Sequence, residues 1–509
     1  MFDQLLQGFG TILTPQNLAF ALLGCVLGML VGVLPGFGPA AATALLLPVT
    51  LTLPAVTAII MLAAILYGAA YGGTITAVLI NVPGETSSVA TTLDGYQMAQ
   101  QGRAGPALAI AAIGSFVGGL VGVLGFVVAA PLSRFALAFG PAEFFALTLL
   151  GLTLVIGLAS GSTLKALIAA SLGLLLGVVG LDPLNGVARF TFGSQQILDG
   201  LNLVPVIMGL FGLSELLLSI ERSVASAAAI KVGKVLPTRD DLRRSALPIA
   251  RGSVVGFATG LLPGSPGAVA AFGSYVLEKR LSRHPERFGH GAVEGVAAPE
   301  SANNANAVSG MIPLFTLGIP TSATMAVMMG AFIINGLVPG PLLFRDHPDV
   351  AWGIIASMVV GNVILLALNL PLVRIWITCL RIPYPTLYVL VVGFMLVGAY
   401  TLDGSVFNVV VMVAAGILGY VLRKIDIPLA PVALTLVLGP LMERSLSNAL
   451  QISRGSPSIF LDSSIAMTLL VATVMVLALA TMKTPLRTLA RAVAARTRQG
   501  PSTDTSPKA

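Results

Sequence analysis

The 509-residue sequence predicts an all-α polytopic membrane protein, and three observations support that fold class. Hydrophobic residues make up 56% of the chain and charged residues 10%, against about 25% charged in soluble domains, and the mean hydropathy is +0.94. Several apolar runs are long enough to cross about 30 Å of hydrocarbon, at 105–132, 141–160, 164–181, 350–372, 384–400, 405–422 and 462–482. A β-barrel would show short alternating segments instead. Finally, long motifs occur twice, and we expect about 10–12 membrane segments.

The duplication is clearest in two glycine-rich segments. Residues 24–36 read GCVLGMLVGVLPG, and residues 252–264 read GSVVGFATGLLPG. Downstream, each copy carries a glycine and a proline ten residues apart, at Gly73 and Pro83 and at Gly310 and Pro320. A duplicated apolar half with proline- and glycine-broken helices in matching positions is typical of secondary transporters, in which the substrate binds at the interface of the repeats.

Basic residues predict which segments are cytoplasmic. They gather at 222–251, at 279–287 and in the tail from 483 onward, and the positive-inside rule places all three stretches in the cytoplasm. Between Arg251 and Lys279 the chain therefore leaves the cytoplasm and returns to it. These roughly 27 residues are too few for two crossings, which need about 40, so we expect a re-entrant hairpin with its tip at 262–267.

The first repeat has an equivalent tip at 34–39, but its surroundings differ in charge. The turn at 51–54 carries no charge, and neither Lys nor Arg precedes Arg103. An uncharged turn in one repeat and a basic one in the other favour hairpins that enter from opposite sides, hence inverted repeats, over a parallel arrangement. We assign 17–220 to repeat one, 221–250 to a basic cytoplasmic linker, 251–445 to repeat two, 462–482 to an extra transmembrane helix and 483–509 to a basic cytoplasmic tail.

Three polar segments occur where a membrane protein is expected to be apolar. They read NVPGETSS at 81–88, PESANNAN at 299–306 and GIPTSAT at 318–324. A proline break leaves unpaired N–H groups at the start of the following half-helix, and these favour an anion. Hydroxyl, amide and freed carbonyl oxygens can also coordinate Na⁺. The combination predicts a site for a carboxylate substrate accompanied by a cation.

Each polar segment also has a purely structural interpretation. Ser and Thr often cap helices, and Pro-Gly often marks an interfacial turn. The functional interpretation is favoured most for 299–306, because a carboxylate and three amides are unfavourable within a membrane unless they serve a purpose. Elsewhere, Asp94 is expected to be a surface cap, and the GxxxGxxxG rows are expected to allow close helix packing. The two cysteines and three histidines have no metal-ligand spacing.

Three long motifs resemble the large membrane subunit of the tripartite tricarboxylate transporters, the TctA-type family. They read VGVLPGFGPAAATALLLP, YGGTITAVLINVPGETSSVATTLDGYQMAQQGRAGPAL and APESANNANAVSGMIPLFTLGIPTSAT. The resemblance implies a multi-pass permease that imports citrate, other tricarboxylates or related organic acids across the bacterial inner membrane by ion-coupled alternating access. It also implies two protein partners, a small membrane subunit and a periplasmic substrate-binding protein. We expect a lipid environment, a cytoplasmic C-terminus, no nucleic-acid partner and no cofactor besides the coupling ion.

The resemblance and the polar segments together predict the residues of the path. The expected substrate and ion site comprises Gly36, Gly38, Asn81, Pro83, Gly84, Glu85, Thr86, Ser87, Gly264, Glu300, Ser301, Asn303, Asn304, Pro320, Thr321 and Ser322. The neutral oxygens favour Na⁺ over H⁺ as coupling ion, bound near Glu300, Asn303 and Asn304. Two alternatives stay open, a carboxylate-selective channel and an intramembrane enzyme. The enzyme is disfavoured because HExxH is absent and no histidine lies in an apolar span.

Overall fold

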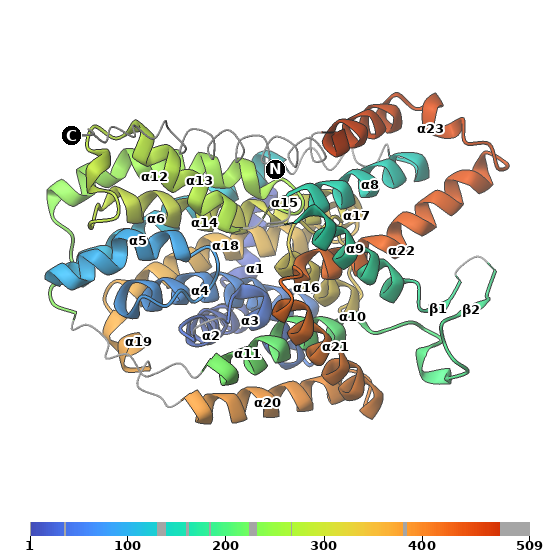
Figure 1. The fold of residues 1–509 in the computed structure, drawn as a ribbon, viewed down its shortest axis with the longest axis horizontal. Coiled ribbons are helices and arrows are strands. Elements are labelled where there is room, and N and C mark those ends of the chain that lie inside the picture. Colours follow the sequence, from blue (N-terminus) through green and yellow to red (C-terminus); the bar gives the residue numbers. More distant parts are fainter. Residues whose placement is uncertain are drawn as a thin grey trace, which may run out of the picture.

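The computed structural model describes residues 2–34, 37–129, 139–158, 162–182, 185–222, 232–265, 267–379 and 384–478. In these ranges the protein is almost entirely helical. Eight of the described helices are long and apolar enough to cross a membrane, and five shorter apolar helices accompany them. The predicted class, an all-α polytopic membrane protein, is confirmed. Figure 1 shows the helices stacked in a broad bundle, from which α23 and the end of α22 extend at one corner.

Most of the described helices follow one another with short connections, apart from the longer one between α9 and α10. In the first half they are α1 (Phe2–Ile12), α2 (Pro15–Gly32), α3 (Pro39–Leu46), α4 (Ala55–Ile80), α5 (Val89–Met98), α6 (Ala104–Ala129), α8 (Pro141–Leu158), α9 (Thr163–Gly177), α10 (Leu203–Ile207) and α11 (Ser214–Arg222). In the second half they are α12 (Arg239–Gly260), α13 (Gly267–Leu281), α14 (Glu294–Ser309), α15 (Met311–Leu317), α16 (Ala323–Ile334), α17 (Pro341–Asp346), α18 (Pro348–Asn369), α19 (Val373–Cys379), α20 (Tyr384–Thr401), α21 (Val406–Lys424), α22 (Leu429–Ile452) and α23 (Ile459–Asp462). A further helix covers Ser464–Ala478.

In both predicted hairpin regions, a helix ends where proline and glycine interrupt the apolar sequence. That the two hairpins are re-entrant stays a prediction. The α12–α13 hairpin turns between Gly260 and Gly267, and Arg251 of α12 donates to both carboxylate oxygens of Glu278 on α13, at 2.9 and 2.5 Å. With 15 residues, α13 is about 22 Å long, less than the hydrocarbon thickness. The α2–α3 hairpin is built in the same order, although two residues of its tip, 35 and 36, lie outside the described residues.

The glycine rows press one arm of each hairpin onto the backbone of a central helix. A Cβ on Gly28 of α2 would lie 2.3 Å from the carbonyl oxygen of Ile65 on α4. A Cβ on Gly256 of α12 would lie 2.1 Å from the carbonyl oxygen of Ala302 on α14. Gly24, Gly32, Gly252 and Gly260 make the same kind of contact one turn to either side. Close helix packing by these rows is therefore confirmed, and α4 and α14 are held in the same way.

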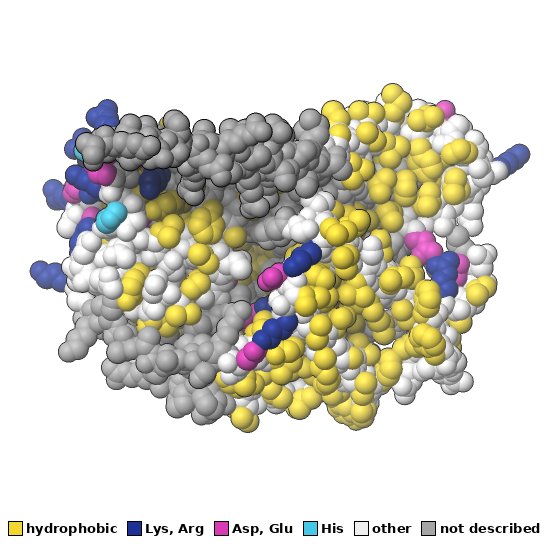
Figure 2. Space-filling view, in the orientation of Figure 1, with side chains coloured by type: hydrophobic (Ala, Val, Ile, Leu, Met, Phe, Trp, Pro, Cys, Tyr) yellow, Lys and Arg dark blue, Asp and Glu magenta, His cyan; other side chains and the backbone are white. Residues whose placement is uncertain are grey.

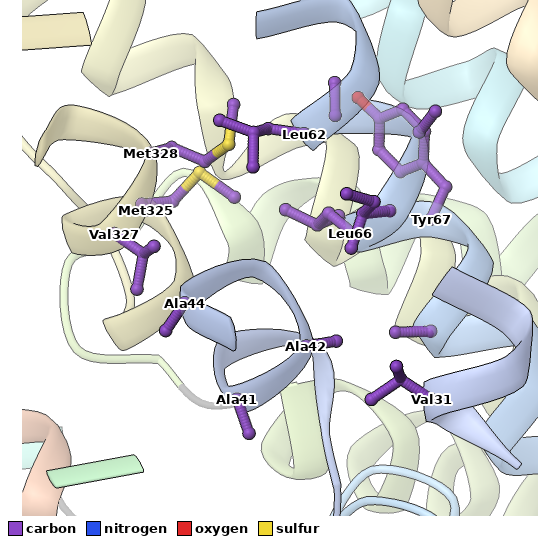
Figure 3. Packing of buried hydrophobic residues seen from close by; sticks show 14 of the residues in the cluster. Val31, Ala41, Ala42, Ala44, Leu62, Leu66, Tyr67, Met325, Val327 and Met328 are labelled. Carbon is purple, nitrogen blue, oxygen red and sulfur yellow. The ribbon is translucent and has the colours of Figure 1, made fainter. Parts of the chain in front are cut away.

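The short helix α3 lies in the core beside the third polar segment. It packs against both α4 and α16, and Figure 3 shows Ala42 and Ala44 of α3 in one cluster with Leu66 of α4 and Met325 and Val327 of α16. The small side chains of α3 allow this approach. As a result, the first hairpin and the segment that precedes α16 are neighbours, although almost three hundred residues separate them.

One apolar run was predicted wrongly as a spanning segment. Residues 164–181 do not form one long helix, because α9 ends at Gly177 and the chain enters an antiparallel hairpin of β1 (Gly180–Leu181) and β2 (Ala188–Arg189). The 15 residues of α9 extend about 22 Å, short of a full crossing. Gly180, the first residue of β1, has a φ of +118°, a conformation that glycine adopts readily. Arg189 then pairs with Asp182 and with Glu443 of α22.

The segment boundaries predicted from composition differ from the helix ends. Helix α12 begins at Arg239, inside the stretch assigned to the linker, since Thr238 and Asp241 form a capping box there. Helix α22 continues to Ile452, beyond the predicted end of repeat two. The basic tail lies outside the described residues. Neither the inverted relation of the repeats nor the domain limits are tested by these helix ends, and both stay predictions.

Charge is unevenly distributed over the surface of the bundle. Figure 2 shows hydrophobic side chains over much of the right half of this face, with a few charged side chains among them, whereas Lys and Arg are most frequent at the left edge, the end at which α5, α6 and α12 lie in Figure 1. Ion pairs join this part of the chain, as in Arg103 with Asp241 and Arg244 with Glu294. A broad apolar surface of this kind suits contact with lipid.

Candidate functional site

The first polar segment is a helix break after α4. Helix α4 ends at Ile80, and its C-cap Asn81 has a left-handed φ of 57°. Helix does not resume until Val89. Within the break, the N–H of Gly84 donates to the carbonyl oxygen of Gly73 at 3.4 Å. A Cβ on Gly84 would lie 2.4 Å from the Cα of Gly73, so only glycine lets the break fold back onto α4.

The third polar segment is a matching break after α15. Helix α15 ends with Gly318 at a left-handed φ of 71°, and α16 begins at Ala323. Ser322 caps α16, because its hydroxyl accepts from the N–H of Met325 at 3.3 Å. The Thr321 hydroxyl donates to the carbonyl oxygen of Gly310 at 2.9 Å. Both breaks therefore follow a left-handed cap and contain a proline, Pro83 in one and Pro320 in the other.

The two breaks meet the second polar segment around a small cavity. The amide of Asn303 on α14 donates to Oε1 of Glu85 at 2.9 Å, which joins the first break to α14. The N–H of Gly264, at the tip of the α12–α13 hairpin, donates to the carbonyl oxygen of Thr321 at 2.9 Å. The enclosed volume is about 90 Å³, and its lining includes Pro39, Glu85, Ser265, Gly267, Asn303, Asn306, Gly310, Thr321, Ser322 and Thr324.

Three helix N-termini lie on this cavity. Helix α3 begins at Pro39, α13 at Gly267 and α16 at Ala323, beside the lining residues Ser322 and Thr324. A Cβ on Gly38, the residue before α3, would lie 3.3 Å from the Cβ of Glu85. The first N–H groups of a helix have no partner within it, and the helix dipole is positive at this end. The cavity therefore combines three electropositive helix ends and several amide and hydroxyl side chains with one carboxylate, that of Glu85. Helix ends of this kind favour anionic groups.

A second polar cluster lies deeper, around Glu300 of α14. The carboxylate is 1% exposed and accepts from three hydroxyls, those of Thr74 on α4 at 2.8 Å, Thr91 on α5 at 2.5 Å and Ser115 on α6 at 3.3 Å. The amide of Asn304 donates to Ser115 Oγ at 2.7 Å and to the carbonyl oxygen of Glu300 at 3.2 Å. Three helices thus supply hydroxyl donors to one buried carboxylate on a fourth helix.

The comparison with known proteins identifies the family. The sequence matches the Tripartite tricarboxylate transporter TctA family over residues 18–434. The chain belongs to the TctA family. It is 48% identical over 472 residues to an uncharacterized 52.8 kDa protein in the TAR-I ttuC' 3' region of Agrobacterium vitis, an alignment that covers 92% of this chain and 94% of that protein.

A second relative from Agrobacterium vitis matches part of the chain. It is an uncharacterized protein in the TAR-II ttuC' 3' region, 49% identical over 211 residues, which cover 42% of this chain and 87% of that protein. No solved structure was found to match the chain. Membership of the TctA family makes this protein a membrane component of a transporter.

Seven of the sixteen predicted site residues lie at or next to the cavity of this TctA family member. Glu85, Asn303, Thr321 and Ser322 line it, and Gly38 and Gly264 contact lining residues. Ser87 is buried against α13, because a Cβ on Gly267 would lie 3.4 Å from the Ser87 Cβ. Pro83, Gly84 and Pro320 shape the breaks without lining the cavity.

Other predicted residues lie elsewhere. Asn81 and Thr86 are exposed at the outer side of the first break. The Ser301 hydroxyl donates to the carbonyl oxygen of Ala298 at 3.0 Å and packs against Gly252, so its contacts are structural. Gly36 lies outside the described residues. The three residues predicted to hold Na⁺ are divided between two clusters, since Asn303 contacts Glu85 while Asn304 joins Glu300.

The expectation that Asp94 is a surface cap was wrong. Asp94 is 0% exposed, and its Oδ1 accepts from the backbone N–H groups of Gly289, Gly291 and Ala292 at 2.8–2.9 Å. Its Oδ2 accepts from the hydroxyl of Tyr275 at 2.9 Å. The carboxylate therefore ties α5 to the loop before α14, and four donors compensate its burial.

Sequence reasoning also missed several polar residues. Ser265, Asn306 and Thr324 line the cavity, and Thr74 and Ser115 contact Glu300. Thr74 and Ser115 are isolated hydroxyl residues in apolar helices, where such side chains most often bond to a carbonyl of their own helix. Asn306 and Thr324 lie within the polar segments, so the polar pattern that singled out their neighbours could have identified them too.

Proposed function

We propose that this protein is the large permease subunit of a binding-protein-dependent secondary transporter that imports tricarboxylates or related organic acids. The observation that carries the proposal is the convergence of three helix N-termini, two helix breaks and Asn303 on one cavity. Helix ends attract an anionic group without a fixed cationic side chain, so the site holds a carboxylate yet can release it. This is the requirement of a carrier that must both bind and discharge its substrate.

The size of the cavity supports a closed state of an alternating-access cycle. About 90 Å³ accommodates one carboxylate group and water, whereas pockets for whole small-molecule ligands are about 300–1,000 Å³. The cavity must therefore open for an entire organic acid to enter. The bond between Gly264 and Thr321 joins a hairpin tip to the third polar segment. Separation of this pair is the movement we propose for opening on one side.

The remaining parts of the proposal concern energy, partners and location. Transport is coupled to a cation gradient, with Na⁺ favoured over H⁺. This coupling is supported by the carboxyl group of Glu300 with its hydroxyl contacts and by the contact of Glu85 with Asn303. The protein works in the bacterial inner membrane with its C-terminus in the cytoplasm. A small membrane subunit and a periplasmic binding protein accompany it, and the binding protein delivers the substrate.

The test of this function is uptake of a labelled panel of tricarboxylates and dicarboxylates into cells that produce the three components. We expect accumulation above the external concentration only when an Na⁺ or H⁺ gradient is imposed. Cells without the permease serve as the control. If the acids merely equilibrate across the membrane, the protein is a channel. If no acid enters under either gradient, the proposed substrate class is wrong.

A further inference from the structure

The buried carboxylate of Glu300 has no charged partner that would compensate it. Glu300 is 1% exposed, and within the described part of the chain it forms no ion pair with Lys, Arg or His. Burial of an unpaired carboxylate is strongly unfavourable, and hydroxyl hydrogen bonds offset only part of that free energy. Either a proton on the carboxyl group or a bound cation would remove this cost.

The groups around Glu300 are suited to a small monovalent cation. Thr74, Thr91 and Ser115 place three hydroxyl oxygens within 3.3 Å of the two carboxylate oxygens, and they come from three different helices. Hydroxyl groups can turn their hydrogens outward and present lone pairs to a hard cation. One carboxylate with neutral oxygens balances a single positive charge, whereas Ca²⁺ and Mg²⁺ would need more carboxylates or retained water.

We propose that Glu300, Thr74, Thr91 and Ser115 form a Na⁺ site that is separate from the substrate cavity. The inference rests on the proposed function and assigns the coupling ion of that function to a position. None of these four residues lines the 90 Å³ cavity. Asn303, which was expected to help hold the ion, instead contacts Glu85 in that cavity.

The two sites are joined through neighbouring residues of one helix. Asn303 faces the cavity, while Asn304, next to it on α14, donates to Ser115 in the cation cluster. On the other side, α4 carries Thr74 and leads into the break that holds Glu85. Occupation of the cluster by Na⁺ draws α4, α5 and α6 toward α14 and so orders the cavity wall. Coupling between ion and substrate follows from these shared elements.

The test is Na⁺-dependent thermal stabilisation of the full-length protein purified in detergent. Na⁺ is varied against N-methyl-D-glucamine at constant ionic strength, because a ligand of the folded state raises the unfolding temperature with its concentration. We expect a saturable increase for the wild type and none for Glu300→Gln. Thr91→Val, which keeps the shape but removes the hydroxyl, should need about tenfold more Na⁺ for half of the increase.

Two variants control for damage to the fold. Thr91→Ser keeps the hydroxyl and should respond like the wild type. Thr92→Val makes the same substitution one residue further on α5, where the hydroxyl bonds only to the carbonyl oxygen of Val89, and it should also respond like the wild type. Equal Na⁺ responses of Thr91→Val and Thr92→Val would overturn the site. So would a wild type that responds to Na⁺ no more than to N-methyl-D-glucamine.

The result is distinguishable from failure of the proposed function. If the wild type shows no Na⁺ stabilisation but cells still accumulate carboxylates under an H⁺ gradient, the cation site is wrong and the transporter proposal stands. A second outcome is that no carboxylate accumulates under any gradient, while Na⁺ still stabilises the wild type and Thr91→Val weakens that response. The cation site then stands and the substrate proposal is wrong.

Discussion

Replacement of Asn303 by alanine is expected to lower carboxylate uptake about a hundredfold. The Asn303 amide is the donor that holds Glu85 in the cavity wall, at 2.9 Å, and its side chain lines the cavity. Without it, a half-buried carboxylate loses its amide partner, a loss of about 1.5–3 kcal/mol for a hydrogen bond to a charged group. The measurement is the initial rate of labelled substrate uptake, normalised to the amount of protein in the membrane.

Asn335→Ala is the matched control for this prediction. The Asn335 amide also donates a hydrogen bond, to the carbonyl oxygen of Ala331 at 2.8 Å, but it lies at the C-terminal end of α16 and does not line the cavity. We expect its uptake rate to stay within about twofold of the wild type, as for a surface hydrogen bond. Equal uptake by the Asn303 and Asn335 variants would remove the cavity from the transport path.

The second large effect is expected for Gly256→Ala, which should lower the stability of the folded protein by about 1–3 kcal/mol. The added Cβ would lie 2.1 Å from the carbonyl oxygen of Ala302 and 2.7 Å from its Cα. Because the obstacle is backbone, no side-chain rotation relieves it, and α12 must move away from α14. The midpoint of thermal unfolding in detergent should fall accordingly.

Gly273→Ala provides the comparison on the partner arm of the same hairpin. Gly273 lies within α13, and a Cβ there would meet nothing within 4 Å. Alanine favours helix over glycine by up to about 1 kcal/mol, so this variant should unfold at the wild-type temperature or slightly above it. A Gly256→Ala protein as stable as Gly273→Ala would show that the close approach of α12 to α14 is not made in solution.

The fold class and the helix breaks could be predicted because their signals are local. Continuous apolar runs, paired glycine rows and the prolines at Pro83 and Pro320 all lie in short stretches of sequence. The run at 164–181 was predicted wrongly because its apolarity does not show that the helix ends at Gly177 and that a β-hairpin begins at Gly180. Helix ends set by side-chain caps, such as Thr238 before α12, were likewise hidden by the composition of the linker.

The sequence allowed the polar segments of the site to be predicted one by one, but not the contacts between them. Polar residues in 81–88, 299–306 and 318–324 stood out against an apolar background, but their partners did not. The contact of Glu85 with Asn303 joins residues 218 positions apart, and the contact of Thr74 with Glu300 joins residues 226 positions apart. Asp94 looked like a surface residue for the same reason, since its partners at 289–292 belong to a distant loop.

The most direct test of the central claim, that the cavity is the substrate site, is protection of a cysteine placed in its wall. Ser322→Cys is introduced after Cys25 and Cys379 have been replaced by alanine, because Ser322 lines the cavity and caps α16. Its rate of modification by a small membrane-permeant thiol reagent is measured in membranes containing all three components, with and without a transported carboxylate. We predict that the carboxylate slows modification at concentrations that saturate uptake. Equal modification rates in a protein that still transports the acid would contradict the claim.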